Sequence, residues 1–195
     1  MAKADYIYAP SKRGALRQGE MITGLVQARL TIAAVGADPK KVKWSGIEHP
    51  FAIILSQDCD LAQDWRARRR ASAADPNARK RLLSNILFAQ VHEAAEVKVD
   101  IGVSDIWKRV RQNKDERYHF LQAVEAKGDR LGCGLPELSI DFKHYFTLPT
   151  DEVYKRILKS AQRRCRLVSP YMEHLSTRFC YYQFRVALPQ DHLST

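Results

Sequence analysis

Short runs of apolar residues recur along the chain and give the first indication of its secondary structure. The run at Pro50–Ser56 (PFAIILS) is continuous and too short for two helical turns, so it predicts a buried strand. Met21–Val35 is rich in β-branched and apolar residues, and Asn85–His92 is a second short apolar run. Apolar and polar residues alternate in Arg117–Val124 and in Glu137–Leu148, the latter with a bulge. Each of these segments is predicted to form one strand, and Met21–Val35 is long enough to form one or two.

Other segments have the features of helices. Ser104–Asn113 begins with a serine suited to an N-cap, and Thr150–Arg164 has acidic residues near its start and basic residues near its end. Segment 169–188 carries a core-facing stripe of apolar residues every three or four positions, at Tyr171, Leu175, Phe179, Tyr182 and Val186. Arg166–Val168 is expected to be a short strand between the last two helices. Strands and helices of these kinds together predict an α+β fold.

The remaining segments define the expected domain organisation. The 195 residues fit one domain, residues 1–195. Residues 1–20 are mixed and basic, and we expect a loose N-terminal arm. Residues 62–84 are dominated by alanine and arginine, with a break at Pro76, and predict a basic insertion that is helical or mobile. Residues 169–188 are expected to form the closing helix of this domain.

Composition and charge narrow the class of protein. The chain is 45% hydrophobic and contains 8 Tyr, 7 Phe and 3 Trp, which excludes a disordered chain. Lys and Arg number 32 against 22 Asp and Glu, which gives a net charge of +10. Such an excess favours a polyanionic partner, either nucleic acid or an acidic protein. The sequence leaves the oligomeric state open.

The cysteines and the lack of long apolar segments bear on location. No apolar stretch is long enough to span a membrane, and no secretory signal is recognised at the start of the chain. The chain has 4 Cys and none forms a C-x-x-C pair, so we expect reduced thiols in a cytoplasmic protein. Cys59 is expected in the core.

The segment His49–Ser56 resembles a strand of the PemK and MazF toxin family. In that family an Arg-Pro pair, aliphatic residues and a serine follow a glycine-containing loop, and a second strand carries Thr or Ser. Pro50 and Ser56 match this pattern. The chain departs from it at His49, where the family has an arginine implied in catalysis or RNA contact, and in Phe88–His92, which lacks the Thr or Ser. The resemblance covers roughly residues 55 to 90. The apolar strand motif that carries it has low specificity.

The resemblance implies a small SH3-like β-barrel, elaborated here by helical insertions and a C-terminal helix. It also implies a role in toxin–antitoxin or phage-defence systems. Ser56–Leu61 (SQDCDL) and Ser169–Leu175 (SPYMEHL) are similar to uncharacterised bacterial proteins of mobile or defence-associated genes.

Two carboxylates directly follow the buried strand at Pro50–Ser56 and are the candidate catalytic residues. Asp58 and Asp60 would point the same way if the segment Gln57–Asp60 is extended. Two such carboxylates hold Mg²⁺ or share a proton, and the alternative is capping of a turn or an ion pair with arginine. Asp141-Phe142-Lys143 has the D-x-K spacing of restriction-like nucleases, which makes Asp141 a further metal-binding candidate.

Basic residues beside an aromatic residue are the candidate nucleic-acid contacts. Arginine binds phosphate oxygens bidentately, and tryptophan stacks on bases. The first candidate set surrounds the basic insertion and comprises Trp65, Arg66, Arg68, Arg69, Arg70, Arg79, Lys80 and Arg81. Further sets lie at Lys108–Lys114 and Lys155–Arg166, and solvated helix faces are the alternative for all of them.

Three functions follow as hypotheses. The first is a nucleic-acid-associated, toxin-like barrel that binds RNA or DNA, with cleavage left open. The second is a non-catalytic adaptor or regulator that binds an acidic protein. The third is a metal-dependent nuclease that uses Asp58 and Asp60, and a nuclease is the only enzyme class that the motifs suggest. No cofactor is expected apart from Mg²⁺ in the nuclease hypothesis.

Overall fold

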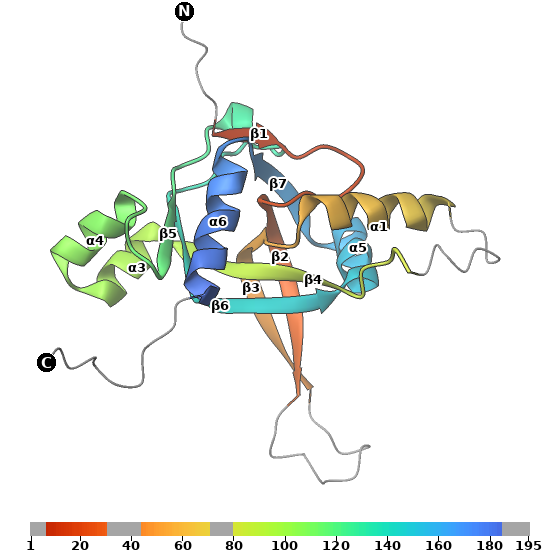
Figure 1. The fold of residues 1–195 in the computed structure, drawn as a ribbon, viewed down its shortest axis with the longest axis horizontal. Helices are drawn as coiled ribbons and strands as arrows, with labels where there is room; N and C mark the ends of the chain where they lie inside the picture. The colour runs from red at the N-terminus through yellow and green to blue at the C-terminus, as the bar shows by residue number, and fades with distance from the viewer. Residues whose placement is uncertain (1–6, 31–43, 71–79, 185–195) are drawn as a thin grey trace, which may run out of the picture.

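The computed structural model describes residues 7–30, 44–70 and 80–184. These residues contain one antiparallel sheet (Figure 1). Its strands have the order β1-β7-β2-β3-β4-β6-β5, and every neighbouring pair is antiparallel. The strand bounds are β1 Tyr8–Pro10, β2 Glu20–Leu30, β3 Trp44–Ile54, β4 Asn85–Glu93, β5 Tyr118–Leu121, β6 Leu138–Pro149 and β7 Gln162–Leu167.

The α+β class is confirmed, but the seven-stranded sheet is not closed into a barrel. The edge strands β1 and β5 do not pair with each other. The Tyr8 hydroxyl of β1 donates a hydrogen bond of 3.0 Å to the carbonyl of Gln122, the residue that follows β5. The expected SH3-like barrel is therefore not established by this arrangement.

Five α-helices and a short 3₁₀ helix surround the sheet in the described part of the chain (Figure 1). Their bounds are α1 Asp58–Arg70, α3 Ala94–Ile101, α4 Ser104–Arg111, η3 Ala126–Gly128, α5 Thr150–Lys159 and α6 Tyr171–Phe184. α6 crosses one part of the sheet, α1 and α5 lie together at one end, and α3 and α4 lie at the other end. None of these helices is long and apolar enough to cross a membrane.

Different helices pack on different clusters of the hydrophobic core. Leu175, Phe179 and Tyr182 of α6 pack on a cluster around Phe142 and Ile140 of β6. These α6 residues belong to the stripe seen in the sequence, whereas Val186 lies outside the described residues. A second cluster lies under α1 and α5, and a third joins Val110 of α4 to Phe120 of β5. The helical stripe in the sequence thus identified a core-facing surface.

Several segments differ from the sequence-based expectation. Residues 7–20 of the expected loose arm instead form β1 and a packed loop in which Leu16 is fully buried. The expected helix Thr150–Arg164 ends at Lys159, and Arg163 and Arg164 belong to β7. In β7, alternate residues are buried, and this period of two outweighs the charge pattern that favoured a helix. Helix α3 was not anticipated.

The predicted bulge in Glu137–Leu148 is confirmed in β6. Ala89 of β4 pairs with Tyr145, whereas Val91 pairs with Ile140, so the two strands change register between these pairs. The extra residues lie on β6 between Ile140 and Tyr145. Bulges of this kind redirect side chains, and here the bulge holds the D-x-K segment.

Candidate nucleic-acid interface

The two candidate catalytic carboxylates do not lie in an extended segment. α1 begins at Asp58, so Asp58 and Asp60 both belong to its first turn. Residues two positions apart on a helix point in directions about 200° apart, whereas in a strand they would point the same way. The expectation that these two side chains converge is therefore wrong. Their catalytic role stays a prediction without support from this geometry.

Asp58 forms an ion pair with Arg17 of the loop between β1 and β2. The Arg17 Nε and Nη2 atoms donate to the two carboxylate oxygens of Asp58 at 2.6 and 2.5 Å. The backbone N–H of Gln18 donates to Asp58 at 3.2 Å. The hydrogen bond to Asp58 raises the pKa of Arg17 above its usual value. Asp58 therefore fastens this loop to the start of α1, which matches the ion-pair alternative.

Two of the candidate nucleic-acid contacts face inward and attach α1 to the body of the protein. Arg68 Nε donates to the buried Asp64 at 2.7 Å, and its Nη1 atom donates to Asp151 of α5. The Trp65 ring lies 5.7 Å from the ring of Tyr154, also on α5. Arg68 therefore contributes ion pairs and Trp65 contributes packing. Arg68 is not an unpaired cation, and the Trp65 ring is half-buried.

The other described candidates of this set face solvent. Arg66 and Arg69 are exposed on α1, and Lys80 and Arg81 are exposed in the segment that precedes β4. That segment lies beside α1 because the backbone N–H of Leu83 donates to Asp64 at 2.9 Å. None of the four has a carboxylate within ion-pair distance among residues 7–30, 44–70 and 80–184. The side chain of Arg70 and all of Arg79 lie outside the described residues.

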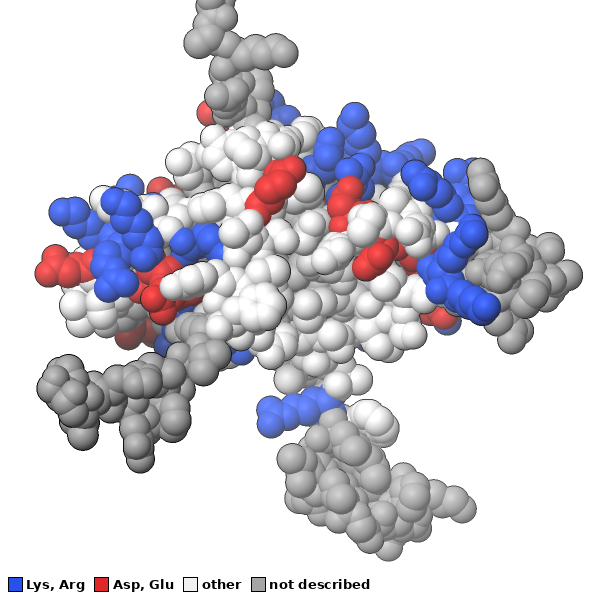
Figure 2. Space-filling model, in the orientation of Figure 1, with Lys and Arg blue, Asp and Glu red and all other residues white. Residues whose placement is uncertain are grey.

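Two further basic residues adjoin these four. Lys12 and Arg13 are exposed in the loop between β1 and β2, which the Arg17–Asp58 ion pair holds against α1. Figure 2 shows Lys and Arg side chains gathered over this loop and over α1, on one side of the molecule. We call this set the α1 basic surface; it consists of Lys12, Arg13, Arg66, Arg69, Lys80 and Arg81.

The other basic sets have different environments. Arg156, Arg163 and Arg164 are each paired with a carboxylate, at Glu152, Glu20 and Asp129. Half of the Lys155–Arg166 set is thus neutralised within the fold, whereas Lys155, Lys159 and Arg166 form no ion pair with the described residues. Exposed Lys108 and Arg109 of α4 form a separate group at the opposite end from α1 (Figure 2).

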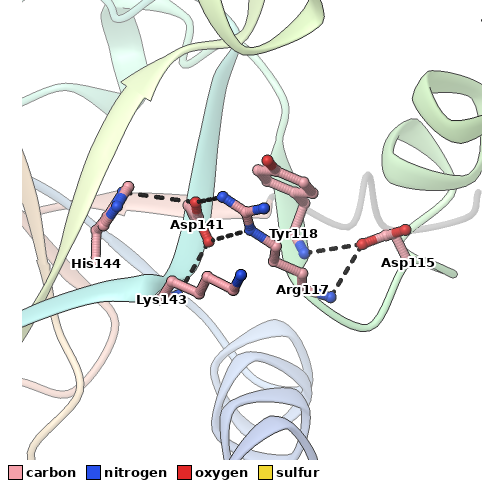
Figure 3. A network of polar contacts seen from close by, with 6 residues as sticks. All are labelled: Asp115, Arg117, Tyr118, Asp141, Lys143 and His144. Carbon is pink, nitrogen blue, oxygen red and sulfur yellow. Dashed lines mark hydrogen bonds and ion pairs between the residues drawn. The ribbon is translucent and has the colours of Figure 1, made fainter. Parts of the chain in front are cut away.

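The D-x-K segment lies in a polar network at the β6 bulge (Figure 3). The buried carboxylate of Asp141 accepts bonds from Arg117, with Nε at 2.9 Å, and from the backbone N–H of Lys143 at 3.0 Å. His144 Nδ1 lies 3.5 Å from the same carboxylate. Burial alone would raise the pKa of Asp141, but the bonds from Arg117 and Lys143 outweigh burial and lower it.

This network closes the bulge and is not arranged for a divalent metal. Arg117 already binds both oxygens of Asp141, and its guanidinium lies 4.7 Å from the centre of the Tyr118 ring. In the part of the chain that the structure describes, no three His, Cys, Asp or Glu side chains form a metal-binding group. Cys59 is exposed and not in the core as expected, because it occupies the first turn of α1.

Sequence reasoning missed a cluster of histidines between β5 and α6. The ring centres of His119 and His174 lie 5.4 Å apart, although 55 positions separate the two residues in the chain. Arg178 of α6 donates to the carbonyls of Asn113, Asp115 and Tyr118 nearby. No local spacing in the sequence signals this cluster, since it depends on how α6 packs against β5.

Comparison with known proteins gives no relative for this chain. The chain matches no protein-family model, no curated protein and no solved structure. The resemblance to the PemK and MazF family therefore rests on the residues named above, and the function is argued from the geometry alone.

Proposed function

We propose that this protein binds nucleic acid through the α1 basic surface. The observation that carries the proposal is a group of exposed lysines and arginines without carboxylate partners in the described part of the chain, gathered on one side of the fold. Exposed cations of this kind bind phosphates by releasing condensed counterions. Arginine adds bidentate hydrogen bonds to phosphate oxygens.

The way α1 is attached supports this proposal. Arg68, Asp64 and Trp65 hold the inner side of the helix, so Arg66 and Arg69 are presented to solvent from a fixed scaffold. Phosphate contacts made from a fixed element position a strand without reading its sequence. We therefore propose binding with little base preference, and cleavage is not part of the proposal.

Fluorescence anisotropy of labelled 20-nucleotide RNA, single-stranded DNA and duplex DNA tests the proposal between 50 and 300 mM KCl. The variant Arg66→Ala/Arg69→Ala is expected to weaken binding at least tenfold at low salt. It should also reduce the slope of log K against log[salt] by about 0.7 to 0.9 per lost contact. Lys108→Ala/Arg109→Ala removes the same charge from α4 and is the matched control.

Equal losses in the two double variants would show that net charge alone drives binding, and would contradict a defined surface. The absence of salt-dependent binding to all three probes would also contradict the proposal. An acidic protein that co-purifies after nuclease treatment, and that Arg66→Ala/Arg69→Ala releases, would instead support the adaptor function.

A further inference from the structure

A large cavity lies at the end of the fold where β1, η3 and the start of α6 meet. Its volume is about 800 Å³, within the range of small-molecule sites in proteins. Much of its wall is apolar, from residues such as Ile7, Val124, Val168 and Pro170. This cavity involves no residue of the α1 basic surface.

A smaller cavity of about 100 Å³ adjoins the large one. Ile7, Tyr8, Gln122 and Tyr171 line both, so the two tyrosines lie where the cavities meet. The smaller cavity also has polar walls from Arg111, Asn113, His119 and His174. The two cavities therefore adjoin each other across these shared residues, one with a largely apolar wall and the other with a more polar wall.

His119 is the unusual residue of the smaller cavity. Its side chain is 3% exposed, and its Nδ1 atom is buried with no hydrogen-bond partner. A buried imidazole nitrogen without a partner costs free energy, so a ligand or water that reaches it after a small movement of the surrounding side chains is favoured. His174 also lines the cavity and lies beside this ring, with the ring centres 5.4 Å apart.

The charges around the smaller cavity favour an anion. Arg111 lines it, Arg178 lies beside both histidines, and no Asp or Glu is among the described residues that line it. Arg178 donates to backbone carbonyls and forms no ion pair with a described carboxylate; burial lowers its pKa more than the nearby charge of Asp115 raises it. Burial and the Arg178 charge lower the pKa of both His119 and His174, so both imidazoles offer N–H donors in the neutral form.

We propose that the joined cavities bind a nucleoside monophosphate unit. The phosphate occupies the end formed by Arg111, His119 and His174, and the base occupies the large apolar cavity. Tyr8 and Tyr171 at the junction supply aromatic surface, on which bases stack. The unit is either a free mononucleotide or the phosphorylated end of a strand, because both present the same chemistry.

Isothermal titration calorimetry of the full chain tests this proposal with AMP, GMP, CMP and UMP as ligands. At least one is expected to bind with a Kd below 1 mM, and the matching nucleoside without phosphate at least tenfold more weakly. Arg111→Ala and His174→Ala, both exposed positions, should each weaken binding at least tenfold. Lys114→Ala, which removes a nearby charge outside the cavity, and Arg66→Ala/Arg69→Ala should leave it unchanged.

The imidazole ¹⁵N resonances of His119 provide a readout that does not depend on a variant. Nδ1 of His119 is expected to shift on addition of the mononucleotide, and no shift at saturation would overturn its assigned role. No binding of any mononucleotide at 5 mM would overturn the proposal. So would equal binding of nucleoside and nucleotide, or binding of inorganic phosphate as tight as that of the nucleotide.

Oligonucleotides of ten residues, with and without a 5′-phosphate, distinguish the two sources of the unit. These titrations use the Arg66→Ala/Arg69→Ala variant, so that the α1 basic surface does not contribute. Tighter binding of the phosphorylated strand than of the mononucleotide supports a strand end, and the reverse order supports a free nucleotide. The proposal for the α1 basic surface fails or succeeds separately, since it is measured on other residues.

Discussion

Glu20 of β2 and Arg163 of β7 form a buried bidentate ion pair. Arg163 Nε and Nη2 lie 2.6 and 2.9 Å from the two carboxylate oxygens, and the side chains are 0% and 6% exposed for Glu20 and Arg163. Arg163 also donates to the carbonyls of Gly14 and Ala15, at 2.8 and 2.9 Å. This one pair therefore joins two strands to the loop that carries Lys12 and Arg13.

Breaking this pair is expected to destabilise the protein strongly. Arg163→Met leaves the Glu20 carboxylate buried without its partner, which should lower the free energy of unfolding by about 3–5 kcal/mol. Urea denaturation measures the change, and Arg166→Met in the same strand is the matched control. Glu20→Leu/Arg163→Met should recover part of the loss. A loss in Arg163→Met no larger than in Arg166→Met would contradict the central role of the pair.

Asp58 and Asp60 are expected to behave differently when each is changed to asparagine. Asp58→Asn weakens the bond to Arg17, which is 44% exposed, so we expect a loss of about 1 kcal/mol in unfolding free energy. Asp60→Asn removes an exposed carboxylate that forms no ion pair with the described residues, and should change stability by less than about 0.5 kcal/mol. Thermal and urea unfolding provide the comparison. Mg²⁺-dependent cleavage that both variants abolish without loss of stability would instead restore the nuclease hypothesis.

Arg68 and Arg69 are neighbours on α1 with different expected roles. Arg68→Ala leaves the buried Asp64 without its cation, and should lower the unfolding free energy by about 2–3 kcal/mol. Arg69→Ala should leave stability within about 0.5 kcal/mol but weaken nucleic-acid binding several-fold. Urea denaturation and anisotropy on the same preparations measure both quantities. The assignment is wrong if Arg69→Ala is the more destabilising of the two.

Because His119 is buried, we expect the free energy of unfolding to decrease as the pH is lowered. Burial, the Arg178 charge and His174 lower the pKa of His119 to about 3 in the folded state, against 6.5 for an unperturbed histidine. Between these two values the unfolded chain binds a proton that the folded protein does not, so stability decreases as pH falls below 6.5. At pH 5 the loss from this residue is about 2 kcal/mol, from 1.36 kcal/mol per pH unit.

Urea denaturation at pH 7.5 and pH 5.0 measures this effect. His119→Phe should lose less stability between the two pH values than the unmodified protein does. His144→Phe, at an exposed histidine, is the control and should retain the full dependence. The same pH dependence in His119→Phe would mean that other groups cause it. His49, whose pKa burial also lowers, is the first of these to test.

Elements whose side chains follow a simple apolar pattern could be predicted from the amino-acid sequence. The apolar run at Pro50–Ser56 begins in β3, which ends at Ile54, and Asn85–His92 lies in β4. The stripe from Tyr171 to Tyr182 faces the core from α6. A continuous apolar run too short for a helix indicates a buried strand, and burial of every third or fourth residue fixes both the helical conformation and the face that meets the core. The excess of basic residues was also plain from composition.

Which charges are available at the surface depends on the packing of distant parts of the chain. Arg68 and Arg69 are adjacent and chemically alike, yet one meets Asp64 and Asp151 while the other faces solvent. Likewise His119 and His174 come together only because α6 packs beside β5. Ion pairs and cavities of this kind depend on contacts between residues far apart in the chain, and no local pattern encodes such contacts.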